Sequence, residues 1–179
     1  MKAFLVRHSH ALADVDDPLR PLSAQGRETT REVAGFFKLN GRLSSVCAVW
    51  HSPLARARET AEMLIQELGL DGLLIEAPGL MPEDDPAAVA DRLDNANDPV
   101  IIVGHEPQLG ALATTLVRGK TKPVIFDFRK TAVLALERAG GRHKKSGRSC
   151  WRVRWYFSPE LLAAGKASGA KEWRVGDAR

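Results

Sequence analysis

The sequence predicts an α/β fold, a three-layer sandwich in which a largely parallel central sheet of about six strands has helices on both faces. Two observations support this prediction. Short apolar runs with the length of buried strands alternate with longer segments of helical periodicity. In addition, 44% of the 179 residues are hydrophobic, which is enough for one ordinary core. We expect a single domain over residues 1–162 and a weakly patterned, mobile tail over 163–179.

Six short apolar runs are expected to form the strands. Their length and aliphatic content suit burial in a sheet that is covered on both faces. They are 2–7, 46–50, 73–75, 100–103, 131–136 and 151–157. The last two are expected to form a hairpin-like pair around a basic loop. Side chains alternate along a strand, so one face of the last strand is expected to carry Trp151, Val153, Trp155 and Phe157.

Capping residues and glycines mark the ends of the expected helices. Ser23 and Ser52 are expected N-caps, and Pro53 would take the first helical position after Ser52. Asn40-Gly41 and Gly69 are expected to end these two helices. Later helices are expected to open at Asp85-Pro86, at Pro107 and, as a short last helix, at Ser158-Pro159.

The net charge of +4 comes from one segment of the chain. Residues 138–154 carry seven Lys or Arg and no acidic residue, so the rest of the chain has a net charge of −3. The segment is either a solvated loop or a surface for an anionic partner such as a phosphoprotein. A nucleic-acid partner is disfavoured, because the nearby aromatic residues follow strand spacing instead of interleaving with the basic ones.

The protein is expected to be cytoplasmic, with no membrane partner. No apolar run approaches the roughly 20 residues of a membrane span. Arg7 interrupts the first apolar stretch too early for a secretory signal. Of the two cysteines, Cys47 lies in a strand-like apolar run, so we expect a core residue and not half of a disulfide.

Three segments that carry chemistry directly follow predicted strands. They are Arg7-His8, the segment 51–56 and His105. Ligands of such folds bind outside the carboxyl ends of the strands, so we expect these residues at one edge of the sheet. An imidazole is a good nucleophile toward phosphorus, and guanidinium groups bind phosphoryl oxygens in pairs. Each histidine alone fits a structural role, but the combination indicates phosphoryl transfer without a metal.

Arg56 adds to this interpretation because of its place in the expected second helix. The helix dipole disfavours a cation in the first turn, so an anion bound at the same helix end explains Arg56 well. The alternative is an ordinary surface arginine. We expect no cofactor and no metal, because His, Cys, Asp and Glu nowhere have the spacing of a metal site.

These segments resemble the motifs of the histidine phosphatase superfamily, the phosphoglycerate mutase-like group. Three motifs stand in its order: Leu5-Val6-Arg7-His8, Ser52-Pro53-x-x-Arg56-Ala57-x-x-Thr60 and Gly104-His105. Within that group the chain is most similar to the phosphohistidine phosphatase SixA family. Beside the short chain, the features that carry this similarity are Arg20-Pro21-Leu22-Ser23-x-x-Gly26, Leu80-x-Pro82-x-x-Asp85-Pro86 and the Trp-rich strand before Ser158-Pro159. The resemblance spans roughly residues 1–162.

The resemblance implies the phosphoglycerate mutase-like fold and a metal-independent phosphatase. It implies that His8 is phosphorylated transiently and that Arg7, Arg56 and His105 form the phosphate pocket. Arg20 is a further candidate for a phosphate or substrate contact. Ser9 replaces the glycine that usually follows the histidine, and its hydroxyl is a candidate donor to phosphate. Inorganic phosphate would be the product.

The substrate stays open between a phosphohistidine-containing protein, such as a phosphotransfer domain, and a small phosphorylated molecule. Many members that act on phosphate esters use a carboxylic acid to protonate the leaving oxygen. Here the corresponding region offers Glu83, Asp84 and Asp85, and Asp85 is typical of a helix cap. An imidazole leaves more easily than an alkoxide, so the lack of a clear acid favours phosphohistidine. A third alternative is a non-catalytic module that binds phosphoproteins.

Overall fold

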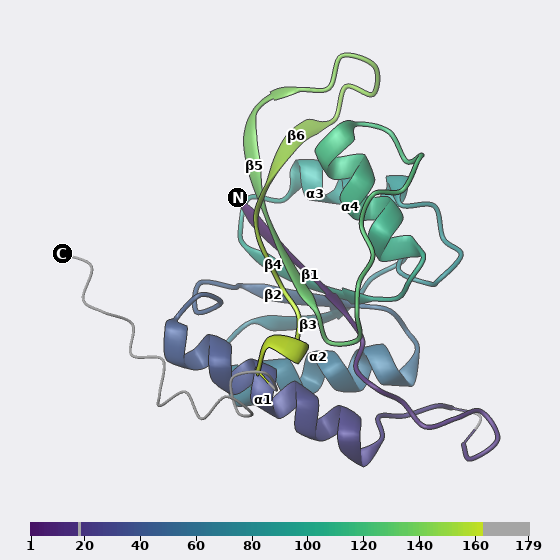
Figure 1. Ribbon diagram of the computed structural model, residues 1–179. Coiled ribbons are helices and arrows are strands. Elements are labelled where there is room, and N and C mark those ends of the chain that lie inside the picture. Colours follow the sequence, from purple (N-terminus) through teal and green to yellow (C-terminus); the bar gives the residue numbers. More distant parts are fainter. Residues whose placement is uncertain (18, 163–179) are drawn as a thin grey trace.

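A single six-stranded sheet forms the centre of the computed structural model, which describes residues 1–17 and 19–162 (Figure 1). The strands are β1 (Lys2–Arg7), β2 (Ala48–His51), β3 (Leu73–Glu76), β4 (Val100–Gly104), β5 (Val133–Arg142) and β6 (Ser149–Phe157). Their order in the sheet is β3-β2-β4-β1-β5-β6. The pairs among β1 to β4 are parallel, whereas β5 is antiparallel to both β1 and β6. The predicted largely parallel sheet is therefore confirmed.

Helices cover both faces of this sheet, which confirms the three-layer architecture. They are α1 (Ala24–Asn40), α2 (Ala55–Leu68), α3 (Ala87–Asn95) and α4 (Gln108–Arg118). Figure 1 shows α1 and α2 on one face and α3 and α4 on the other. Because side chains alternate along β1, Phe4 and Val6 enter the apolar cluster under α1 and α2, whereas Ala3 and Leu5 enter the cluster under α3 and α4. None of the helices described is long and apolar enough to cross a bilayer. The predicted tail, 163–179, lies outside the described residues.

The two helices on the first face differ in how well their starts were predicted. The Ser23 hydroxyl accepts a hydrogen bond from the Gly26 N–H at 3.1 Å, so Ser23 is the N-cap of α1 as expected. The predicted start of α2 at Ser52 is wrong, because α2 begins at Ala55 and has no side-chain cap. Ser52 still donates its backbone N–H to Val103 O of β4 at 3.1 Å, which keeps this segment extended and delays the helix.

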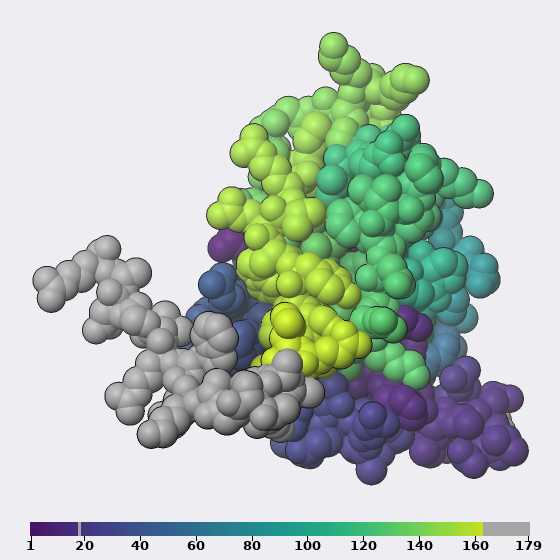
Figure 2. Space-filling view, in the orientation of Figure 1, coloured from purple at the N-terminus to yellow at the C-terminus, as the bar shows by residue number. Residues whose placement is uncertain are grey.

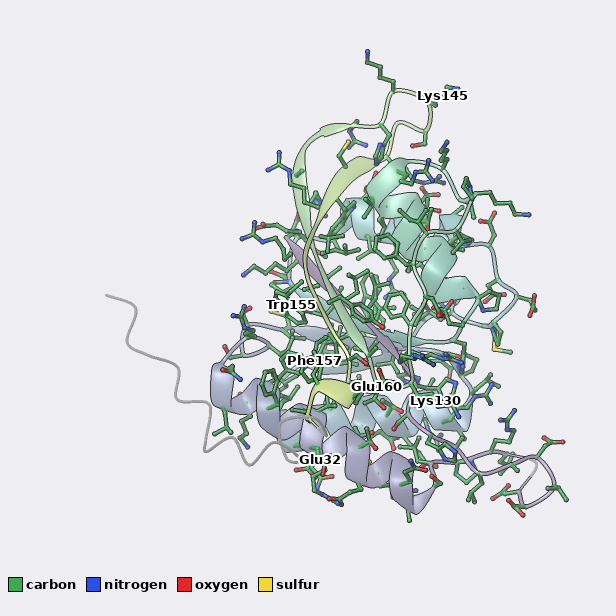
Figure 3. All side chains as sticks on the ribbon, viewed as in Figure 1. Glu32, Lys130, Lys145, Trp155, Phe157 and Glu160 are labelled. Atoms are coloured by element: carbon green, nitrogen blue, oxygen red, sulfur yellow. The ribbon has the colours of Figure 1, made fainter. Side chains whose placement is uncertain are left out.

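The prediction that four residues of β6 share one face is also wrong. A β-bulge shifts the pairing of β5 with β6, so that Ala135 faces Trp155 while Leu136 faces Val153. An extra residue in one strand reverses the alternation of side chains beyond it. Trp155 therefore lies with Phe157 on the α1 side of the sheet (Figure 3), whereas Trp151 enters the cluster on the opposite side.

The basic segment forms the far end of the β5–β6 hairpin, which projects from the body of the molecule (Figure 2). Both strands are longer than predicted at this end, and β5 begins later, at Val133 instead of Thr131. Arg148 pairs with Asp91 of α3 at 2.6 Å, and Arg142 pairs with Asp94 at 3.3 Å. Acidic residues of α3 thus neutralise part of the segment.

Two smaller predictions have opposite outcomes. The last helix begins at Glu160, directly after Ser158-Pro159, as expected. Cys47 is exposed instead of buried in the core, because it lies one residue before β2 begins at Ala48. Both Cys47 and Cys150 are free thiols.

Candidate active site

The carboxyl end of the parallel strands brings the two predicted histidines together. His8 follows β1, and its backbone N–H donates to Gly104 O at the end of β4 at 3.0 Å. His105 follows Gly104 directly. The centres of the two imidazole rings are 4.8 Å apart, and the ring planes are tilted by 53°. Both side chains are buried, with 7% of His8 and 2% of His105 exposed.

The hydrogen bond of His8 fixes which ring nitrogen carries the proton. His8 Nδ1 lies 2.6 Å from Ser9 O, and because a carbonyl oxygen only accepts, Nδ1–H is the donor. Nε2 then holds the free electron pair. Burial lowers the pKa of His8 to about 3, against the opposing effect of this hydrogen bond. The charges of Arg56, Arg7 and Lys130 lower the pKa further. His8 is therefore a neutral imidazole at physiological pH, with Nε2 available as a nucleophile.

His105 is held from the neighbouring strand. Its Nε2 lies 2.9 Å from the Ser52 hydroxyl, whereas its Nδ1 is buried and has no partner among the described residues. Burial lowers its pKa to about 3, and the charges of His8, Arg56 and Arg7 add to the shift. One nitrogen of a neutral, fixed ring is thus left to bind a ligand. The hydroxyl predicted as a helix cap instead orients His105.

The two predicted arginines lie beside these rings. Arg7 Nη1 donates to Phe128 O at 2.6 Å, while Arg7 Nε is buried without a partner among the described residues. Arg56 is half-buried in the first turn of α2, and its pKa is lowered by burial and then by the charge of Arg20. Unpaired donors that face like charges are typical of a site built for an anion.

Ser9 takes a place that the sequence did not predict. Its hydroxyl donates to Gly26 O at 2.9 Å and accepts from the Thr131 hydroxyl at 2.8 Å, and its backbone N–H donates to Thr60 Oγ1 at 3.1 Å. Ser9 has no exposed surface. Its one hydroxyl proton is already used, so Ser9 links the loop after β1 to α1, α2 and the segment before β5.

Lys130 is a cation of this site that the sequence analysis missed. Burial lowers the pKa of Lys130, and the charges of Arg7, Arg20 and Arg56 lower it further, so the four cations share one region. We call Arg7, Arg20, Arg56 and Lys130 the cation cluster. Lys130 belongs to no recognisable motif and follows no parallel strand, so no signal in the sequence could have indicated it.

Glu106, next to His105, is a second residue that the sequence analysis passed over. Its carboxylate accepts the backbone N–H of Phe128 at 2.9 Å and that of Gly110 at 3.2 Å. Phe128 in turn offers its carbonyl to Arg7. Burial raises the pKa of Glu106, while these hydrogen bonds and Arg7 oppose the shift. Glu106 thus fixes the segment that orients Arg7.

The acidic residues considered as general acids are mostly engaged elsewhere. Asp85 Oδ1 accepts from Ala87 N at 2.9 Å at the start of α3, as expected of a helix cap. Asp84 Oδ2 accepts from Met81 N at 2.8 Å within its own turn. Glu83 is exposed. A groove of about 440 Å³ next to Ser52 is lined by Pro53, Glu76, Ala77, Pro78, Gly79, Leu80, Met81 and Asp84.

Comparison with known proteins shows the protein family to which the chain belongs. The family model of the histidine phosphatase superfamily (branch 1) matches residues 3–81. An uncharacterised protein of Picosynechococcus sp. is 31% identical over 150 residues, which cover 79% of this chain and 88% of that protein. The chain therefore belongs to the histidine phosphatase superfamily, branch 1.

Within the superfamily, the chain is similar to proteins named for phosphohistidine. It is 28% identical to the phosphohistidine phosphatase SixA of Escherichia coli (strain K12) over 172 residues, which cover 93% of this chain and 99% of that protein. A solved structure of the protein histidine phosphatase SixA complexed with tungstate has a TM-score of 0.74 at 28% identity and covers 90% of this chain and 99% of that one. The phosphoglycerate mutase-like fold is thereby confirmed.

Proposed function

We propose that this chain is a phosphohistidine phosphatase, which removes phosphate from a phosphohistidine-containing protein through a transient phosphohistidine on His8. One observation carries the proposal: two buried, neutral imidazoles in ring contact lie beside cations that have no carboxylate partner among the described residues. A neutral imidazole attacks phosphorus, and fixed positive charges stabilise the phosphoryl group during transfer. The similarity to SixA supports the same assignment. We assign the activity to residues 1–162 as one domain.

The first chemical step forms a bond between His8 Nε2 and the phosphorus of the substrate. The phosphorus–nitrogen bond of the substrate breaks, and its imidazole leaves as a neutral ring once the distal nitrogen has taken a proton from solvent. His8 Nδ1–H keeps its hydrogen bond to Ser9 O, so the phosphorylated His8 is an imidazolium. In the second step water attacks phosphorus, the bond to Nε2 breaks, and inorganic phosphate and one proton are released.

The remaining site residues act on the oxygens of the phosphoryl group. Arg7 and Arg56 would bind them through charge-assisted hydrogen bonds. In the tautomer in which the Ser52 hydroxyl donates to Nε2 of His105, the unpartnered Nδ1–H would donate a further hydrogen bond. These groups are held before substrate arrives, by Phe128 O for Arg7 and by the Ser52 hydroxyl for His105. A preorganised set of positive groups needs no metal ion to stabilise the transferred charge.

A phosphate-ester phosphatase of the same superfamily is the second candidate. The observation that favours it is the groove beside Ser52, because Glu76 and Asp84 bring two carboxylates to its wall. An ester needs an acid to protonate its leaving oxygen. Asp84 already accepts a backbone hydrogen bond, and Asp85 holds the start of α3, which makes both poor proton donors. Glu76 and the exposed Glu83 remain as candidate acids for an ester. We place phosphohistidine first because its imidazole leaves with less help from an acid than an alkoxide does.

The test is brief mixing with a phosphohistidine phosphotransfer protein, followed by intact-mass analysis and a measurement of acid lability. Wild type should take up one acid-labile phosphate while the donor loses its phosphate, and the His8→Ala variant should do neither. If the donor keeps its phosphate while wild type cleaves small phosphate esters, the second candidate replaces the first. If neither is cleaved but the phosphoprotein binds, also to the His8→Ala variant, the chain is a non-catalytic binding module.

A further inference from the structure

The cation cluster contains four basic groups, whereas a phosphoryl group carries only about two negative charges. Seven of the twelve other arginines in the described part of the chain pair with carboxylates within 4.0 Å: Arg27, Arg31, Arg58, Arg129, Arg142, Arg148 and Arg154. Within residues 1–17 and 19–162, none of the four members of the cation cluster has a carboxylate partner within 4.0 Å. Arg129 pairs with Glu160 at 3.7 Å, whereas Lys130, like the other lysines of the described part, has no carboxylate within 4.0 Å there; what distinguishes Lys130 is that three arginines surround it.

Hydrogen bonds fix the backbone of Lys130 against β1. Thr131 N donates to Arg7 O at 3.0 Å, and Arg7 N donates to Ala132 O at 3.3 Å. Thr131 has a φ of 62°, a left-handed conformation that a β-branched residue rarely adopts. Strained backbone of this kind persists only where the surroundings enforce it, and it is common at functional sites. In Figure 3, Lys130 lies near the carboxyl end of β1, whereas Lys145 lies at the far tip of the hairpin.

Arg20 approaches the same place from the loop after β1. It is the other described non-glycine residue with a left-handed backbone, with a φ of 51°. Its Nε donates to Leu12 O at 3.3 Å, and its backbone N–H donates to Asp17 O at 2.9 Å. Arg20 is half-buried and Lys130 is exposed, so both are open to a large substrate. The charges of Arg20 and Arg56 lower the pKa of Lys130, so a bound anion would reduce the repulsion among these cations.

We infer that Arg20 and Lys130 form a second anion subsite next to the phosphate pocket and that this subsite binds an acidic side chain beside the phosphohistidine of the protein substrate. Arg7 and Arg56 take the phosphoryl group, and the two outer cations are left for the carboxylate. The Lys130 ammonium and the Arg20 guanidinium would both donate hydrogen bonds to the carboxylate. The pair therefore favours substrates with a negative charge at the rim of the site. This inference rests on the proposed function.

Three phosphohistidine peptides test the inference. They differ only in the residue next to the phosphohistidine, which is Asp, Asn or Lys. Wild type should hydrolyse the Asp peptide with a kcat/KM about fivefold above that of the Asn peptide, mainly through a lower KM, and the Lys peptide more slowly still. The Lys130→Gln and Arg20→Gln variants should each reduce this preference to less than about twofold. The matched control Lys145→Gln should keep it, and added salt should weaken it.

The outcomes separate three claims: the existence of the second subsite, its assignment to Arg20 and Lys130, and the proposed function. Equal kcat/KM for the Asp and Asn peptides in wild type would overturn the second subsite and leave the proposed function standing. A preference that survives in both the Lys130→Gln and Arg20→Gln variants, or that disappears in Lys145→Gln, would overturn the assignment to these residues. Hydrolysis of none of the three peptides by wild type would overturn the proposed function, and the subsite with it.

Discussion

Lowering the pH from 7.5 to 5 is expected to reduce the free energy of unfolding by about 2 kcal/mol for each of the two buried imidazoles, His8 and His105. In the unfolded chain an imidazole has a pKa of about 6.5 and takes up a proton over this range. In the folded protein the pKa is about 3, so both rings stay neutral at pH 5. The unfolded state therefore binds more protons, and stability falls as the pH falls through 6.5. Any folded pKa below about 4 gives nearly the same loss at pH 5.

Urea unfolding at several pH values, followed by tryptophan fluorescence, measures this loss. The His8→Gln variant removes one titrating ring, so its stability should fall by about 2 kcal/mol less than that of wild type over the same pH range. Other groups that titrate in this range contribute to both proteins and cancel in the comparison. The same pH dependence for wild type and variant would refute the argument that burial keeps His8 neutral.

Three further predictions concern single substitutions, two of which have a matched control. Arg56→Gln should lower kcat/KM by about 100-fold or more, whereas Arg58→Gln should change it less than about twofold, because Arg58 is exposed and pairs only along its own helix. Gly26→Ala should destabilise the protein by about 3 kcal/mol in urea unfolding, because the added Cβ would lie 2.0 Å from the backbone oxygen of His10. Gly35→Ala in the same helix would place its Cβ with nothing within 4 Å and should stabilise the protein, so equal effects would contradict the close approach of Gly26 to His10. Ser9→Ala should lower the free energy of unfolding by about 2 kcal/mol in the same assay, because it leaves the buried hydroxyl of Thr131 without an acceptor.

Most of the fold could be predicted from local patterns. Buried strands such as 100–103 need apolar side chains on both faces, and β4 spans Val100–Gly104. Glycine in the left-handed region ends α1 at Gly41 and α2 at Gly69, and both ends were predicted. These signals are readable because they depend on the conformation of a few consecutive residues.

The prediction failed where the partner of a residue is distant in the sequence. Ser52 looks like a helix cap, but its hydroxyl is 2.9 Å from a nitrogen of His105, which lies in another strand's loop. The bulge in β6 reverses the expected face of Trp151, because the register with β5 is decided by how the hairpin packs. Neither the Ser52–His105 contact nor the bulge can be predicted from the spacing of nearby residues in the sequence.

The sequence by itself determined the family and the alternation of strands and helices. It also predicted that Arg7, His8, Arg56 and His105 meet at one edge of a parallel sheet, because strand ends and motif order point to that edge. Only the tertiary structure decided what these residues are next to. It brought the rings into contact, made them neutral by burial, and added Lys130 from a loop without a motif. The reason is physical: side-chain identity sets the available chemistry, whereas burial and the charges of residues distant in sequence set its protonation and its strength.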